Sequence, residues 1–221
     1  MAEFTIFIGN KTYSSWSLRG WLALKLSGAP FEEVVFPMNG PGSPTREIVQ
    51  ASPSGRVPLL KHRDLLVWDS LAIGEYLAEL FPSAGLWPAE AGARATARAV
   101  SAEMHSGFAS LRSAMPMNVR RQPIELPVSA DVKADISRIV ALWSDCRRTY
   151  GAGGPFLFGR YTFADAMFAP VATRFRTYGV SLDEGARAYV GASHAHPAVE
   201  EWVAAARREP WRIEAYERVG T

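Results

Sequence analysis

The 221-residue chain has only one cysteine, Cys146, and its positive and negative charges nearly cancel. A single cysteine excludes an intrachain disulfide and a cysteine-based metal site, and it favours a reducing compartment. With 24 basic and 22 acidic residues the net charge is +2, so no basic surface for nucleic acid is expected. No hydrophobic run reaches the length of a membrane span, and the N-terminus lacks the pattern of a signal peptide. The sequence therefore predicts a cytoplasmic protein that binds neither nucleic acid nor membrane.

Metal-binding and nucleotide-binding motifs are also missing from the sequence. The four histidines, His62, His105, His194 and His196, match no metal-ligand spacing, so no metal is expected. The apolar fraction of 48% is ordinary for a globular protein, and 221 residues suffice for one large domain or two small ones.

The first part of the chain, up to about residue 82, alternates strand and helix patterns. Short runs rich in β-branched and aromatic residues are separated by segments with helical spacing. The order predicts a parallel strand pair with a right-handed crossover, followed by an antiparallel hairpin. We expect strands at 4–9, 31–36, 56–62 and 65–69, helices at 14–27, 45–51 and 70–81, and a loop at 37–44.

The second part contains no convincing strand. Residues 82–90 have the composition of a linker. Alanine-, leucine- and arginine-rich segments with helical spacing follow, and a proline-rich loop interrupts them at 115–129. The fold class is therefore α/β followed by all-α, with one domain over residues 1–82 and a helical domain over residues 88–221. Helices are expected at 91–114, 130–150, 163–178, 184–192 and 197–208.

Three serines crowd the start of the first expected helix. A serine at this position accepts a hydrogen bond from a free backbone N–H, and one cap needs only one serine. Ser14, Ser15 and Ser17 therefore leave hydroxyl groups to spare. A spare hydroxyl beside a helix N-terminus is well placed to hold an anion.

Three motifs in order resemble the glutathione transferase superfamily. SSWSLR at 14–19 is similar to the Ser-Ser-Cys-Ser-x-Arg signature of the zeta class, with Trp16 in place of the cysteine. SGRVPLL at 54–60 matches the Val-Pro turn of the superfamily, and DSLAIGEYL at 69–77 matches its γ-glutamyl-binding motif. The resemblance covers essentially the whole chain. It implies a thioredoxin-like N-terminal domain (βαβαββα) and a helical C-terminal domain.

The resemblance also implies that glutathione is the co-substrate, bound by these motifs. The proline of the Val-Pro turn is cis in the superfamily, and a cis Pro58 would expose the backbone of Val57 to a peptide ligand that pairs like an added strand. Asp69 and Ser70 would bind the charged groups of the γ-glutamyl unit at the start of a helix. From the residues alone, an ordinary trans bond and a plain helix cap remain open for these two motifs.

The spare hydroxyl would act on the glutathione sulfur. A thiol with a pKa of about 8.5 is mostly protonated at pH 7, whereas the thiolate is the nucleophile. One hydroxyl that donates to the thiolate contributes about 1.5–3 kcal/mol, which lowers the thiol pKa by about one to two units. We expect Ser14 to donate this bond, with Ser15 as the second choice, and Ser17 to cap the helix or pack. The alternative is that all three serines are caps.

The second substrate is expected where the helical domain overhangs the glutathione groove. Trp16 would narrow this site or pack against the helical domain. Guanidinium groups bind carboxylates in a bidentate manner, so arginines near this site predict a small acidic electrophile. The alternative for each arginine is that it lies on the surface and is solvated. Arginines occur on the expected loop at 115–129 (Arg120, Arg121) and on the expected helix at 163–178 (Arg174, Arg176); the residues assigned to the site are Trp16, Arg19, Asn118, Arg120 and Arg176.

Three functions remain open on this evidence. The leading one is a glutathione transferase that adds the thiolate to an electrophilic small molecule. The second is a glutathione-dependent cis–trans isomerase similar to maleylacetoacetate isomerase, although Trp16 departs from the zeta pattern. The third is a non-catalytic glutathione-binding or scaffold protein. The resemblance further implies a homodimer.

Two features indicate structural roles. Thr162 and Asp165 form a capping-box pattern before the expected helix at 163–178. Cys146 falls in the middle of an expected helix, where a buried, inert thiol is predicted.

Overall fold

The computed structural model describes residues 3–38, 40 and 46–220. Its four strands form one mixed sheet with the order β2-β1-β3-β4. β1 pairs with β2 in parallel, and β3 runs antiparallel to both β1 and β4, as the sequence predicts. The strands are β1 (Phe4–Gly9), β2 (Phe31–Phe36), β3 (Leu59–His62) and β4 (Leu65–Trp68). Residues 39 and 41–44 of the expected loop lie outside the described residues, as does Thr45 at the start of the expected helix.

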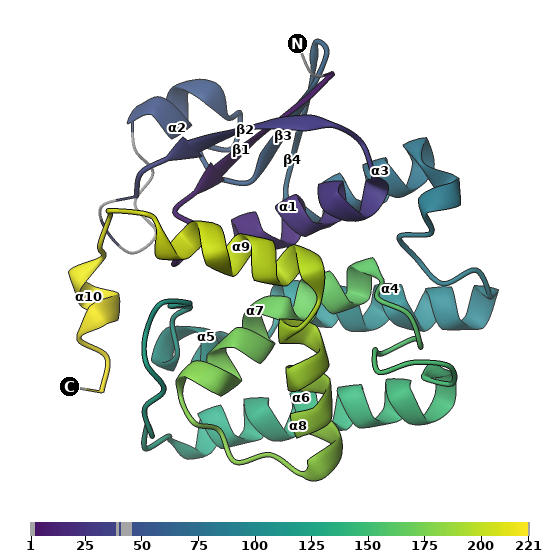
Figure 1. Cartoon of the computed structure of the whole chain (residues 1–221), viewed down its shortest axis with the longest axis vertical. Coiled ribbons are helices and arrows are strands. Elements are labelled where there is room, and N and C mark those ends of the chain that lie inside the picture. The colour runs from purple at the N-terminus through teal and green to yellow at the C-terminus, as the bar shows by residue number, and fades with distance from the viewer. Residues whose placement is uncertain (1–2, 39, 41–45, 221) are drawn as a thin grey trace.

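Three helices cover the sheet. α2 (Arg46–Ala51) lies on one face, and α1 (Ser15–Ser27) and α3 (Ser70–Leu80) lie on the other (Figure 1). α1 is buried along most of its length because it packs against α3 on one side and against α7 (Phe163–Thr177) and α9 (Pro197–Arg207) of the helical layer on the other. The start of α1, where the serines lie, is therefore enclosed between the two layers.

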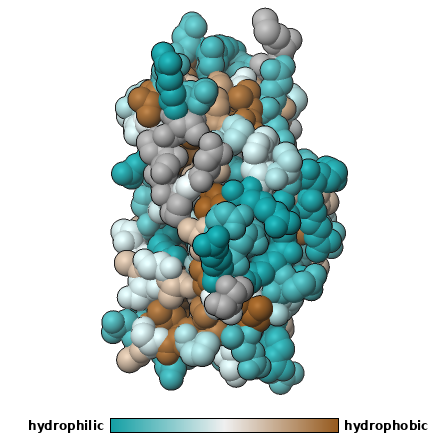
Figure 2. All heavy atoms as spheres, turned by 90° about the vertical axis from the view of Figure 1, so that its left-hand side faces the viewer, coloured by the Kyte–Doolittle hydropathy of each residue, from teal (hydrophilic) through white to brown (hydrophobic). Residues whose placement is uncertain are grey.

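The helical layer follows a 3-10 turn at Pro82–Ala84. A continuous hydrophobic core joins it to the sheet layer, and Cys146 is buried within that core as predicted. No helix in the described part of the chain is both long and apolar enough to cross a membrane. One outer face of the molecule is mostly hydrophilic, with hydrophobic residues scattered over it (Figure 2). The helices are α4 (Ala91–Ser106), α5 (Ala109–Ala114), α6 (Ala130–Tyr150), α7 (Phe163–Thr177), α8 (Glu184–His194), α9 (Pro197–Arg207) and α10 (Glu214–Glu217).

Three expectations about these elements were wrong in detail. The helix expected over 91–114 is two helices, because Gly107 is extended and Phe108 adopts a left-handed conformation with φ of 62°. The strand expected over 56–62 begins only at Leu59, after a cis Val57–Pro58 bond. α10 was not expected at all.

The start of α7 carries the predicted capping box. The Asp165 carboxylate accepts a hydrogen bond from the Thr162 N–H at 2.8 Å, and the reciprocal bond is also present. Asp165 further accepts bonds from the Leu157 N–H and the Tyr189 hydroxyl. It therefore joins the loop before α7 to α8 in addition to capping the helix.

Candidate functional site

Two cavities share the side chain of Trp16, at the junction of the sheet layer and the helical layer. The first, which we call the sheet cavity, has a volume of about 380 Å³. Its walls bring together residues of all three motifs, because Trp16, the turn before β3 and the start of α3 line the same cavity. It is lined by Trp16, Ser54, Arg56, Val57, Pro58, Trp68, Asp69, Ser70 and His105.

Ser70 in the sheet cavity has an unused hydrogen-bonding group. It is the first residue of α3, it is 1% exposed, and its hydroxyl has no partner among the described residues. A buried polar group without a partner is costly, and a helix N-terminus favours negative charge. The position therefore suits a carboxylate supplied by a ligand.

Asp69 lies beside Ser70 in an unusual backbone conformation, with φ of 75° and ψ of 136°. Strained backbone of this kind is concentrated at functional sites. One oxygen of its carboxylate caps α3 by accepting the Leu71 N–H at 2.8 Å, and the other pairs with His105 Nε2 at 3.2 Å. Burial lowers the pKa of His105, and Asp69 acts in the opposite direction.

The second cavity, which we call the interlayer cavity, has a volume of about 210 Å³. Both layers and the C-terminal segment contribute to its walls. Two of its lining side chains are arginines, and two of the three serines face it. The lining residues are Tyr13, Ser14, Ser15, Trp16, Met38, Arg112, Pro116, Met117, Arg174 and Tyr216.

The serines at the start of α1 differ in how their hydroxyl groups are used. Ser14 is the N-cap: its oxygen accepts from the Ser17 N–H, and its hydroxyl donates to Ser17 Oγ at 2.7 Å. Ser17 Oγ also accepts from the Gly9 N–H. The Ser15 oxygen accepts from Arg174 at 3.3 Å, and its own hydrogen has no acceptor among the described residues. Ser15 therefore keeps a donor free, whereas the hydroxyl of Ser14 is committed to the cap.

Arg174 is buried behind Ser15 with part of its guanidinium unused. Its Nε donates to the Met115 carbonyl at 2.7 Å and its Nη2 donates to Ser15, but Nη1 has no partner among the described residues. Burial, and then the charge of Arg112, lower the pKa of Arg174 to about 9, so it remains charged at pH 7. A buried, charged donor beside a cavity is suited to bind an anion.

Trp16 stands between two guanidinium groups. The ring centroid is 4.7 Å from Arg19 and 4.9 Å from Arg112, and His105 contacts the ring edge-on. Cation–π contacts of this kind hold an aromatic ring in place. Trp16 therefore forms a fixed partition that belongs to both cavities.

The structure brings only part of the predicted set together. Ser14, Ser15, Trp16, Val57, Pro58, Asp69 and Ser70 line one or the other of the two cavities. The other four predicted residues line neither. Arg19 is fully buried and donates to the Met167 carbonyl on α7. Arg176 lines a separate cavity on the helical layer.

Asn118 and Arg120 bind the C-terminal segment instead of facing a cavity at Trp16. Asn118 donates to the Glu217 carboxylate at 3.1 Å, and Arg120 donates to the carbonyls of Glu209 and Trp211. These bonds hold the segment that carries Tyr216, one of the side chains of the interlayer cavity. Their contribution to the site is therefore through the segment that they position.

Sequence reasoning did not assign Arg112, His105, Trp68 or Tyr216 to the site. No local pattern marks them, because each comes from a different element and only the fold brings them together. Arg174 is a different case: it lies on the helix for which Arg176 was chosen. Residues two positions apart on a helix are separated by a rotation of about 200° around the helix axis, so Arg174 and Arg176 point to opposite sides of α7. The sequence does not say which of the two sides faces the site.

Among the described residues, no group of three or more histidine, cysteine, aspartate or glutamate side chains is arranged to hold a metal ion. The charged and polar groups that the two cavities offer are guanidinium groups, hydroxyl groups, helix N-termini and the paired Asp69 and His105 side chains.

Comparisons with known proteins agree with this architecture. The family model described as the glutathione S-transferase N-terminal domain matches residues 13–80, and the model described as its C-terminal domain matches residues 119–205. A glutathione transferase homolog from Burkholderia gl BGR1, solved with bound glutathione, has the same fold: the TM-score is 0.70 at 24% identity, over 95% of this chain and 100% of that one.

Two curated relatives extend the comparison. Maleylacetoacetate isomerase of Rattus norvegicus is 30% identical over 172 residues, which is 76% of each chain. Glutathione S-transferase 1 of Dianthus caryophyllus is 38% identical over 81 residues, and that match covers 37% of this chain and 36% of the relative's length.

Proposed function

Since the chain belongs to the glutathione S-transferase superfamily, we propose that it binds glutathione in the sheet cavity and adds the thiolate to an electrophile in the interlayer cavity. The observation that carries the proposal is the Ser15 hydroxyl, which accepts a bond from buried Arg174 and keeps its own hydrogen free. Trp16 lines both cavities, so a ligand in one lies next to a ligand in the other.

The sheet cavity supplies groups for each part of glutathione. The free hydroxyl of Ser70 and the N-terminus of α3 suit the γ-glutamyl carboxylate. Asp69 supplies a negative charge for the ammonium group beside it. The backbone of Val57, just before the cis bond to Pro58, lines the cavity and suits the peptide of the cysteinyl unit.

Thiol activation is assigned to Ser15, with Ser14 in a supporting role. The bond from Arg174 to the Ser15 oxygen withdraws charge from the hydroxyl and makes it a stronger donor to the thiolate. Ser14 instead fixes the N-terminus of α1, which adds a smaller electrostatic contribution of about 0.3–1 kcal/mol. Ser15 donates a hydrogen bond and loses no proton in this mechanism.

The electrophile is proposed to carry a carboxylate. Arg174 Nη1 is a buried donor without a partner, and Arg112 adds a second positive charge to the same cavity. A neutral molecule would leave this buried donor unsatisfied, whereas a carboxylate would satisfy it. The cavity volume of about 210 Å³ limits the electrophile to a small molecule.

A glutathione-dependent cis–trans isomerase is the second candidate. The two guanidinium groups in the interlayer cavity suit a dicarboxylate, and the relative that matches 76% of this chain is a maleylacetoacetate isomerase. The thiolate would add to a conjugated alkene, the resulting single bond would rotate, and the thiolate would leave. Turnover of a maleyl substrate compared with a halo-aromatic acceptor separates the two functions.

The proposal is tested by titrating the thiolate absorbance of bound glutathione in the wild type, Ser15→Ala and Ser14→Ala. We expect Ser15→Ala to raise the thiol pKa by about one to two units, because a donor to the charged sulfur is lost. Ser14→Ala should lower the free energy of unfolding by about 1 kcal/mol through loss of the cap, with a smaller pKa change.

Each other outcome has a distinct meaning. A larger pKa change in Ser14→Ala would transfer the role to Ser14. Unchanged pKa values in both variants would refute a serine mechanism. Glutathione binding with an ordinary thiol pKa in the wild type would favour the non-catalytic binding protein.

A further inference from the structure

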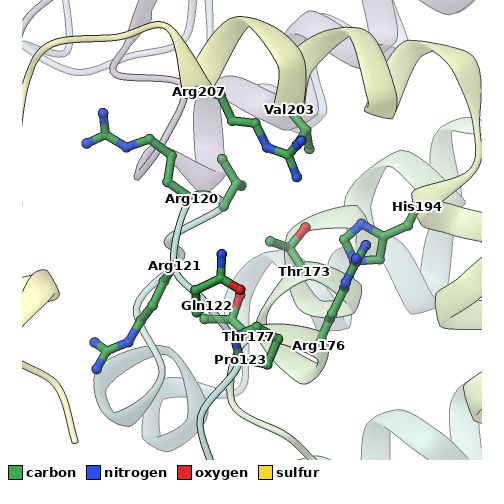
Figure 3. Close-up of a pocket in the computed structure, with 11 residues that line it drawn as sticks. Arg120, Arg121, Gln122, Pro123, Thr173, Arg176, Thr177, His194, Val203 and Arg207 are labelled. Carbon is green, nitrogen blue, oxygen red and sulfur yellow. The ribbon is translucent and has the colours of Figure 1, made fainter. Parts of the chain in front are cut away.

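A third cavity lies in the helical layer and shares no lining residue with the sheet cavity or the interlayer cavity. Its volume is about 520 Å³, within the range typical of sites for small ligands. The walls come from the loop before α6 and from α7, α8 and α9 (Figure 3). We call it the arginine cavity, because Arg120, Arg121, Arg176 and Arg207 line it together with His194.

Two of these arginines extend toward the centre of the cavity from facing helices. Arg207 extends down from α9, and Arg176 extends up from α7 toward the ring of His194 (Figure 3). Neither guanidinium has a hydrogen-bond or ion-pair partner among the described residues. Their donors are therefore available to a ligand between the two helices.

The other two arginines form no ion pair among the described residues, although Arg120 also donates to the Tyr13 hydroxyl, which is bonded to the Glu217 carboxylate. Arg120 donates to the carbonyls of Glu209 and Trp211, and Arg121 donates to the carbonyl of Glu217 at 3.0 Å. These backbone acceptors satisfy hydrogen bonds but carry no net charge. Within the described part of the chain, no carboxylate side chain lines the cavity.

His194 is affected by burial and by the charge of Arg176. Burial is the larger cause that lowers its pKa, and the charge of Arg176 lowers it further, while a contact with the Ala172 carbonyl acts in the opposite direction. These two causes together favour the neutral ring in the absence of a ligand. A bound anion would favour its protonation and gain a further positive partner.

We propose that the arginine cavity binds a small organic anion with at least two acidic groups, phosphate or carboxylate. Guanidinium forks bind such groups in a bidentate manner, and two forks on facing helices suit two separated acidic groups. Val119 and Val203 provide apolar wall for the organic part of the ligand. The site is independent of the proposed glutathione chemistry because it uses different residues.

The test is calorimetric titration with pyrophosphate and, separately, with citrate, at low salt and with glutathione present at a saturating concentration. We expect one anion per chain with an affinity that falls as salt is added. The double variant R176A/R207A should bind at least about tenfold more weakly, because two charged donors are lost. R187A/R208A removes the same charge outside the arginine cavity and is the matched control.

The outcomes separate the possibilities. Binding of pyrophosphate alone assigns a phosphate ligand, and binding of citrate alone assigns a carboxylate ligand. R176K/R207K keeps the charge but loses the forks, so intermediate affinity supports bidentate recognition. The proposal is overturned if the wild type binds neither anion, or if R187A/R208A weakens binding as much as R176A/R207A does. Equal thermal midpoints in all variants establish that the fold is retained.

Discussion

At the scale of single residues, chemically identical side chains have different roles because of what surrounds them. Ser14 caps α1, Ser15 faces Arg174, and Ser17 links the helix to Gly9. The sequence identifies the cluster and the two candidates for thiol activation, and the position of Arg174 is our reason for proposing Ser15. A hydroxyl is a better donor when its oxygen already accepts a bond, and that bond comes from residue 174, far away in sequence.

Arg174→Lys tests the proposed recognition of an acidic electrophile. Lysine keeps a charge, but its donors lie on one nitrogen and cannot reproduce the guanidinium geometry that reaches Met115, Ser15 and a ligand from three separate nitrogens. We expect kcat/KM for a carboxylate-bearing acceptor to fall about tenfold or more relative to a neutral acceptor. The ratio of the two acceptors cancels any change in thiol activation.

Arg176→Lys is the comparison variant for this measurement, because it changes the same residue type two positions along α7. A fall in the ratio for Arg176→Lys, with none for Arg174→Lys, would favour the assignment made from the sequence. An unchanged ratio in both variants would contradict the proposal that the electrophile is acidic.

At the scale of elements, one ring from the helical layer lies directly against α3 of the sheet layer. A Cβ atom placed on Gly74 would lie 2.0 Å from the ring of Phe163, the first residue of α7. The ring can therefore occupy this place only with glycine at position 74. The pattern of the sequence places Gly74 on an apolar helix face, but it does not show that a ring from the other layer occupies the space.

Gly74→Ala should lower the free energy of unfolding by about 1–3 kcal/mol through overpacking. Gly191→Ala is the matched control, because this glycine lies in α8 with no atom within 4 Å of an added Cβ. It should raise the free energy of unfolding by about 0.4–1 kcal/mol. Urea denaturation measures the free energy of unfolding of both variants. The same change in Gly74→Ala as in Gly191→Ala would show that α3 moves to accept the methyl group.

The capping box of α7 predicts a dependence of stability on pH. Burial raises the pKa of Asp165 to about 6 from its ordinary value of 3.8, despite the hydrogen bonds from Leu157, Thr162 and Tyr189. Because the folded state then holds the proton more tightly than the unfolded state, the contribution of Asp165 to stability falls as pH rises through 6.

The wild type should therefore gain stability between pH 7 and pH 5 relative to Asp165→Asn, by on the order of 1 kcal/mol. The difference between the two proteins isolates Asp165 from the histidines that titrate in the same range. Urea unfolding at both pH values measures it. If the free energy of unfolding changes equally in the two proteins between these pH values, the Asp165 carboxylate is ionised throughout this range.

At the scale of the whole molecule, the edge of the sheet is left apolar. Leu65 and Trp68 on the edge strand β4 are 49% and 46% exposed, and Leu80 on α3 is 41% exposed. Exposed apolar edges invite association. We propose that they pack against a second copy of the chain, as the resemblance implies, which would also cover Trp68 at the sheet cavity.

Sedimentation tests this proposal. The wild type should have a mass of about 48 kDa, twice the 24.2 kDa of one chain. Trp68→Glu should shift it toward the monomer, because a charge would be buried in the interface. Val49→Glu, at an exposed apolar position on α2 across the sheet, is the control. A monomeric wild type, or the same shift in both variants, contradicts the proposal.

The cis bond before Pro58 was expected only from the family resemblance, because the residues alone left an ordinary trans bond open. The sequence by itself determined the order of the elements, the parallel pair with its hairpin and the capping box at Thr162. Each depends on neighbours in the chain: hydrophobic periodicity, turn residues and caps are local. It also identified the serines, Asp69 and Ser70, because they lie at helix starts that such patterns mark.

Only the tertiary structure decided which distant side chains meet these residues. Arg174 rather than Arg176 lies behind Ser15, His105 pairs with Asp69, and the C-terminal segment brings Tyr216 to the interlayer cavity. The physical reason is that helix packing sets the rotation of each helix about its axis, and burial on both sides of a helix erases the amphipathic pattern that would reveal that rotation.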